Sequence, residues 1–93
     1  MTAPDTGVDS VFRRQVVEVM ATVLAGLLNR AEPITEDQRF MEELDMDSTL
    51  GLELLLEMED RLGIVIDVER MNQEEMRTVG DMATFVAGHS RPA

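Results

Sequence analysis

The chain has 93 residues, of which 44% are hydrophobic, so it is long enough for one small domain with a single core and is not of the disordered class. Its net charge of −11 argues against binding nucleic acid or anionic lipid and points to basic protein partners. It contains no cysteine, which excludes disulfides, thiolate metal sites and a cysteine nucleophile.

No apolar run approaches the roughly 20 residues that span a bilayer, so we expect no membrane association. The N-terminus lacks the basic and apolar regions of a signal peptide, and a cytoplasmic location is therefore expected.

Residues 1–8 are predicted to form a flexible tail, followed by a first helix from Asp9 to about Asn29, in which apolar residues recur at helical spacing. Either Asp9 or Ser10 could cap its start. The helix ends before Pro33, because the residue that precedes a proline avoids the helical region. A long loop over residues 31–47 follows, pinned by Ile34, Phe40 and Leu44.

A second helix is predicted from about Ser48 to Leu62, and Gly63 is its C-terminal signal. Projected at helical spacing, one broad apolar side should face the core: Leu50, Leu54, Leu55, Met58 and Leu62. The opposite side is acidic, with Glu53, Glu57 and Asp60. Leu52 and Leu56 lie at the edge of the acidic side, where the core does not need them.

The rest of the chain predicts shorter elements. The run Ile64-Val65-Ile66 is interpreted as a buried connector, because no second strand is evident. A capping signal at Asn72 predicts a short helix of about residues 73–76, and a second at Thr78 starts the last helix, which reaches about Ala87. Residues 89–93 are expected to be a flexible tail. The predicted fold is all-α: a four-helix bundle of three longer helices and one short one, with a long loop between the first two.

The chain carries one pattern with chemical meaning, where the acidic loop meets the second helix. Ser48 follows Asp47 there, in the first turn, where free backbone N–H groups and the helix dipole favour a phosphate. An Asp-Ser pair alone is common at helix starts and means little. The spacing around it is more specific, with Phe40, Glu42 and Leu44 before the pair and Glu53 after it.

In this pattern, and in the later run Arg77-Thr78-Val79-Gly80-Asp81-Met82, the chain resembles the acyl carrier protein family over about residues 9–88. The resemblance implies that Ser48 receives a 4′-phosphopantetheine arm from coenzyme A through a phosphopantetheinyl transferase. Asp47 is predicted to cap the helix, and the resemblance implies that it also contacts that transferase. It also implies a carrier that holds acyl intermediates as thioesters, with no catalytic residues of its own.

Two residues depart from the family pattern. Thr49 stands where the family usually has leucine, and Asp45 where it usually has glycine. Neither change removes the hydroxyl of Ser48, and both suggest a specialised carrier.

The acidic side of the second helix is interpreted as a recognition face. Its apolar anchor and surrounding charge suit acyl-loading ligases or synthases with basic docking patches. The residues assigned to partner binding are Thr49, Leu52, Glu53, Leu56, Glu57 and Asp60. The alternative is a solvated acidic face with two incidental leucines.

Other classes of protein fit less well. The run from Asp45 begins like a calcium loop, but Leu50 and Leu56 stand where that loop needs glycine and glutamate, so no metal site is predicted. Few general bases are available for an enzyme. A helical interaction module with an unmodified serine remains an alternative. Six methionines are interpreted as core filler: Met20, Met46, Met58, Met71, Met76 and Met82.

Within the family, the acidic residues before Ser48 favour an acyl carrier over a peptidyl carrier. Because the chain starts at Met1 and ends in a short tail, we expect a free-standing carrier, unless it was excised from a larger synthase. We also expect it to be a monomer. Polyketide or lipopeptide biosynthesis is the first expectation for its pathway, and primary fatty-acid synthesis the second.

Overall fold

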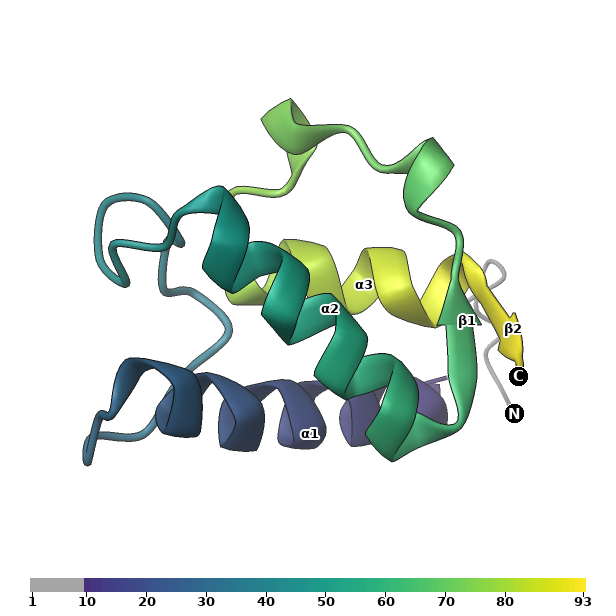
Figure 1. The fold of residues 1–93 in the computed structure, drawn as a ribbon, viewed down its shortest axis with the longest axis horizontal. Helices are drawn as coiled ribbons and strands as arrows, with labels where there is room; N and C mark the ends of the chain where they lie inside the picture. Colours follow the sequence, from purple (N-terminus) through teal and green to yellow (C-terminus); the bar gives the residue numbers. More distant parts are fainter. Residues whose placement is uncertain (1–9) are drawn as a thin grey trace.

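The computed structural model describes residues 10–93, apart from the side chain of Gln73. The tail predicted for residues 1–8, and Asp9 as a helix cap, lie outside the described residues. Three α-helices form the body of the domain: α1 (Ser10–Leu28), α2 (Ser48–Leu62) and α3 (Val79–Gly88). In Figure 1, α2 and α3 lie on the same side of α1, and the segment between α2 and α3 spans the side away from α1.

The core lies where α1 meets the other two helices, which contact each other far less. Buried side chains recur along each helix at the predicted spacing, because one stripe of each amphipathic helix faces the core. The largest of the fully buried ones are Val16, Met20, Leu24, Leu54, Met58, Val79 and Val86. Leu50, Leu55 and Leu62 are only half-buried at its edge.

A small antiparallel sheet was not expected from the sequence. Strand β1 (Ile64–Ile66) pairs with β2 (Ser90–Pro92), with Val65 opposite Arg91. The interpretation of residues 64–66 as a connector without a strand partner was therefore wrong. The prediction of a flexible tail over residues 89–93 was also wrong, because β2 lies within that segment. The sheet depends on a long-range pairing, and Ser-Arg-Pro has no strand pattern that would reveal it.

The fourth helix predicted for residues 73–76 is a 3-10 turn, η2 (Gln73–Glu75), preceded by another, η1 (Val68–Arg70). The described residues therefore hold three α-helices. The predicted start of the last helix is confirmed, because the Thr78 hydroxyl accepts a hydrogen bond from Asp81 N–H while the Asp81 carboxylate accepts one from Thr78 N–H.

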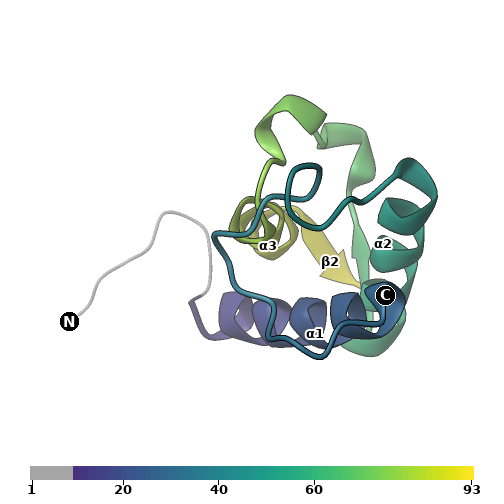
Figure 2. The same cartoon turned by 90° about the vertical axis from the view of Figure 1, so that its left-hand side faces the viewer.

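The long loop between α1 and α2 is fastened to the start of α3 (Figure 2). Three backbone hydrogen bonds of 2.8–3.0 Å join them: Phe40 N–H to the Arg77 carbonyl, Val79 N–H to the Gln38 carbonyl and Gly80 N–H to the Glu36 carbonyl. The loop that leads into α2 is therefore ordered by its contacts with α3.

Arg13 of α1 ties the same corner together. Its guanidinium donates to Glu36 Oε1 at 2.6 Å, to Thr84 Oγ1 at 3.0 Å and to the Gly80 carbonyl at 3.2 Å. The hydrogen bond from Arg13 lowers the pKa of the Glu36 carboxyl below its ordinary value. The hydroxyl of Thr35 likewise lowers the pKa of Asp37.

Within residues 10–93, no helix has both the length and the apolar character needed to cross a membrane.

Candidate functional site

Ser48 is the first residue of α2, and its side chain is exposed. Asp47 is the N-cap in an extended conformation, and its Oδ1 accepts a hydrogen bond of 2.8 Å from Leu50 N–H. The predicted capping role of Asp47 is thus observed. The arrangement leaves the Ser48 hydroxyl free at the positive end of the helix dipole, where a phosphate is favoured.

The loop before Ser48 packs its own apolar side chains into the core. Phe40, Leu44 and Met46 are buried, and Met46 N–H donates to the Phe40 carbonyl at 3.0 Å. Between them, Asp45 adopts a left-handed conformation with φ of 54°. Glycine occupies such conformations at least cost, which gives a physical reason for the glycine expected here from the family resemblance.

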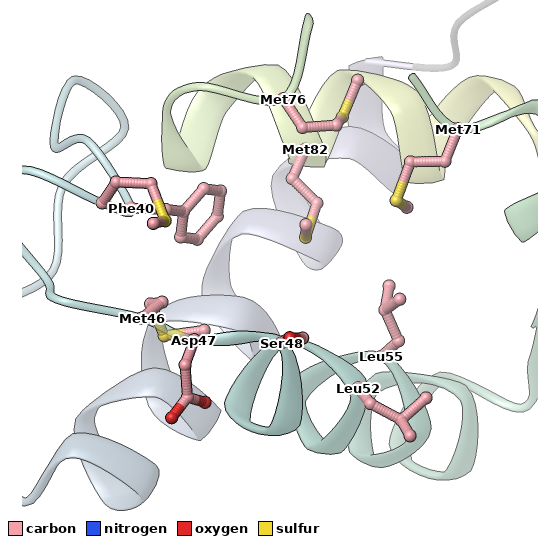
Figure 3. A pocket seen from close by; sticks show the side chains of 11 residues that line it. Phe40, Met46, Asp47, Ser48, Leu52, Leu55, Met71, Met76 and Met82 are labelled. Carbon is pink, nitrogen blue, oxygen red and sulfur yellow. The ribbon is translucent and has the colours of Figure 1, made fainter. Parts of the chain in front are cut away.

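A pocket of about 520 Å³ opens beside Ser48, between α2 and the segments that face it. Figure 3 shows Ser48, Leu52 and Leu55 on the α2 side, with Met71, Met76 and Met82 across from them. Its lining is apolar except at Asp47 and Ser48. The remaining lining residues are Phe40, Met41, Met46 and Gly51.

The methionines of this pocket are the site residues that sequence reasoning missed. Met46 and Met82 are buried as expected of core residues, but Met71 and Met76 are only half-buried and form a wall of the pocket. Met41 is 72% exposed at its rim. Thioether side chains are flexible and adapt to varied apolar surfaces. The high number of methionines in a chain with few aromatic residues was therefore the sequence signal that could have indicated an apolar pocket.

The residues assigned to a recognition face are all exposed, as predicted: Thr49, Leu52, Glu53, Leu56, Glu57 and Asp60. Leu52 and Leu56 are 58% and 56% exposed. The structure nevertheless separates the two leucines. Leu52 lines the pocket beside Ser48, whereas Leu56 lines a second groove that faces α1.

The carboxylates of α2 have different local roles. Glu59 accepts a hydrogen bond of 2.8 Å from Ile66 N–H and so belongs to the fold. Glu57 forms a half-exposed ion pair with Arg61 at 3.5 Å. Among the described side chains, Glu53 and Asp60 take part in no ion pair. The described residues also contain no group of acidic or histidine side chains arranged to hold a metal ion.

Comparison with known proteins identifies the family. Residues 15–86 match the family model described as "Phosphopantetheine attachment site". The chain is 36% identical over 58 residues to an acyl carrier protein of Lactobacillus acidophilus, covering 62% of this chain and 70% of that protein. No solved structure matches the chain at a significant level.

Two further relatives have more specific names. The polyketide-8 synthase acyl carrier protein 2 of Streptomyces avermitilis is 30% identical over 89 residues, which is 95% of this chain and 99% of that protein. The meromycolate extension acyl carrier protein of Mycobacterium leprae is 36% identical over 79 residues, which is 83% of this chain and 66% of that protein.

The family's prosthetic group, 4′-phosphopantetheine, fits the residues at the start of α2, where an exposed hydroxyl stands at a capped helix end beside an apolar pocket. Proteins of this family are modified by a phosphopantetheinyl transferase and interact with biosynthetic enzymes, and they are carriers rather than catalysts. The chain therefore belongs to the phosphopantetheine-binding family, as an acyl carrier protein.

Proposed function

We propose that Ser48 carries the 4′-phosphopantetheine arm and that the protein presents acyl intermediates on it to partner enzymes. The observation that carries this proposal is the exposed hydroxyl of Ser48 on the first residue of a capped helix, at the mouth of an apolar pocket. Asp47 fixes the helix start and directly precedes Ser48, and in this proposal it also contacts the transferase.

In this proposal the protein's own side chains position the attachment oxygen and carry out no reaction step. When bound, the arm supplies the thiol on which an acyl group is held as a thioester. Ser48 offers one oxygen with a defined direction, because the fastened loop and the Asp47 cap fix the start of α2. The free N–H groups of the first turn favour the negative charge of the resulting phosphodiester.

The lining of the pocket supports an acyl cargo rather than an aminoacyl one. Its side chains beyond Ser48 and Asp47 are apolar, so an acyl chain would bury apolar surface against them, whereas an ammonium group placed away from Asp47 would lose its hydration without a compensating partner. The departures at Asp45 and Thr49, and the extended similarity to a polyketide carrier, favour specialised-metabolite biosynthesis of the polyketide or lipopeptide type. Primary fatty-acid synthesis is the second candidate, because plain acyl carrier proteins also match.

The exposed residues of α2 form the docking face in this proposal. Glu53, Glu57 and Asp60 attract basic patches on ligases or synthases and raise the rate of encounter. Leu52 and Leu56 supply apolar area to the contact.

Intact mass after incubation with coenzyme A and a broad-specificity phosphopantetheinyl transferase tests the attachment site. The native chain is expected to gain one phosphopantetheinyl mass, and Ser48→Ala none. Ser10→Ala is the matched control, because it removes an exposed hydroxyl from the first residue of another helix, α1, and should still be modified. Modification of Ser48→Ala would show that another residue carries the arm.

A further inference from the structure

Methionines are concentrated around the pocket beside Ser48. Of the eight methionines in the chain, five line this pocket, from the loop, from the segment between α2 and α3 and from α3 itself: Met41, Met46, Met71, Met76 and Met82. Elsewhere the described core is filled mainly by branched aliphatic side chains. The thioethers therefore gather at the site and are not spread evenly through the interior.

Several of these methionines border open space instead of filling the core. Met71 and Met76 are half-buried, and Met41 is 72% exposed. Figure 3 shows Met71 and Met82 extending toward α2 from the opposite wall. The side chains leave a pocket of about 520 Å³ between the two walls. Whatever enters this space meets thioether groups.

Thioether sulfur distinguishes an aromatic group from a saturated one. The sulfur is polarizable and makes favourable contacts with aromatic rings, often at the ring edge, at about 5 Å. Hydrophobic contact with valine, leucine or isoleucine depends on the apolar area removed from water and has no such preference. An aromatic occupant with several thioethers around it gains an attraction that a saturated occupant lacks.

The protein itself supplies little aromatic surface to the pocket. The chain has three phenylalanines and neither tyrosine nor tryptophan. Phe40 is the one aromatic side chain among the described lining residues, and Phe85 stacks on His89 with ring centroids 4.6 Å apart. Further aromatic surface in contact with the pocket methionines therefore has to come from the occupant.

We propose that the pocket beside Ser48 selects an aromatic acyl group over a saturated one of similar size, a proposal that rests on the carrier function proposed above. The ring lies among Met71, Met76 and Met82, and the carbonyl end of the cargo stays at the mouth, near Ser48. The volume lies within the range of about 300–1,000 Å³ that is usual for small-molecule pockets, so a ring with a short linker has room.

Two thioesters of N-acetylcysteamine, which reproduces the thiol end of the arm, test this preference on the full chain. One carries a phenylpropanoyl group and the other a cyclohexylpropanoyl group, so they differ only in the ring. The cyclohexyl group has the larger apolar surface, and the hydrophobic effect alone would favour it. The phenyl thioester is nevertheless expected to bind about threefold more tightly or better, because of the sulfur contacts.

Methionine methyl groups labelled with carbon-13 report both the affinity and the place of binding. With the phenyl thioester, ring-current shifts are expected at Met71, Met76 and Met82. The methyl groups of Met20 and Met58 should not shift, because both side chains are fully buried and line no part of this pocket.

A sulfur-free variant separates thioether chemistry from pocket shape. Met71→Leu with Met76→Leu keeps a similar volume, which protein interiors tolerate well. This variant should lose most of the preference for the phenyl thioester. Met58→Leu is the matched control, because it removes a sulfur from the buried side of α2 outside the pocket, and it should keep the native preference.

Four results would overturn the inference: a smaller or reversed preference, an unchanged preference in the double variant, shifts spread over all methionines, or no shift up to the solubility limit. The mass measurement on Ser48 is independent of these. A modified Ser48 without ring discrimination removes only the aromatic preference. Ring discrimination in a chain whose Ser48 accepts no arm removes the carrier assignment and leaves a pocket for aromatic groups.

Discussion

Asp45 has a backbone conformation that most side chains avoid, three residues before the serine that we expect to be modified. Its φ of 54° is left-handed, and among non-glycine residues aspartate is one of the few that adopt it readily. We expect Asp45→Ala to lower the free energy of unfolding by about 1 kcal/mol, and Asp45→Gly to leave it equal or higher.

Urea denaturation of the three proteins checks this prediction. Because both variants remove the same charge, their difference isolates the backbone effect from electrostatics. Equal stability of the alanine and glycine variants would show that residue 45 is not held in the left-handed region.

At the scale of elements, the contact between the loop and α3 depends on Gly80. A Cβ added there would lie 3.0–3.2 Å from atoms of Glu36, including its backbone carbonyl oxygen, whereas nothing lies within 4 Å of a Cβ at Gly26. Gly26→Ala should therefore stabilise the protein by up to ~1 kcal/mol, because alanine is the better helix former. Gly80→Ala should destabilise it, since the loop must shift. Thermal melts of both variants give the two signs, and stabilisation by both would contradict the close approach.

The Arg13–Glu36 pair makes the same corner sensitive to acid. The hydrogen bond from Arg13 holds the pKa of Glu36 below its ordinary 4.5 in the folded protein. A lowered folded-state pKa adds stability that is present above the unfolded-state pKa and is lost as the pH falls through the folded one. The melting temperature should therefore fall on acidification below about pH 4.5, and Glu36→Gln should show less of this fall. Glu18→Gln is the control, because it removes another exposed carboxylate, on α1. Its melting temperature should fall with acid as steeply as that of the native protein.

At the scale of the whole molecule, stability depends on the few side chains that fill the space between three helices. Leu54 is fully buried at the middle of α2, whereas Leu52, two residues earlier, is mostly exposed. Leu54→Ala should lower the free energy of unfolding by about 2–5 kcal/mol, a large part of what a domain of this size has. Leu52→Ala should change it by less than ~0.5 kcal/mol. Chemical denaturation measures both, and similar losses would mean that the register of α2 is shifted.

Features with local causes could be predicted from the sequence. The boundaries of α2 depend on the Asp47 cap and on Gly63, which adopts φ of 66° at the C-terminus, and both act within one helical turn. The exposure of Leu52 and Leu56 depends on helical periodicity alone. Ser48 was predicted as the attachment site from the residues around it and from the resemblance to carrier proteins.

Other features depend on which segments meet in space, and no local signal encodes that. Ser90–Pro92 becomes a strand only because β1 lies beside it, and hydrogen bonds with the start of α3 help to order the loop. The sequence predicted Met71 and Met76 as core residues, and only the fold shows that they line the same pocket as Ser48. The sequence by itself thus determined the helix carrying the serine and its exposed acidic face, whereas tertiary packing decided what surrounds that helix, since contacts between distant segments follow from the burial of the whole core.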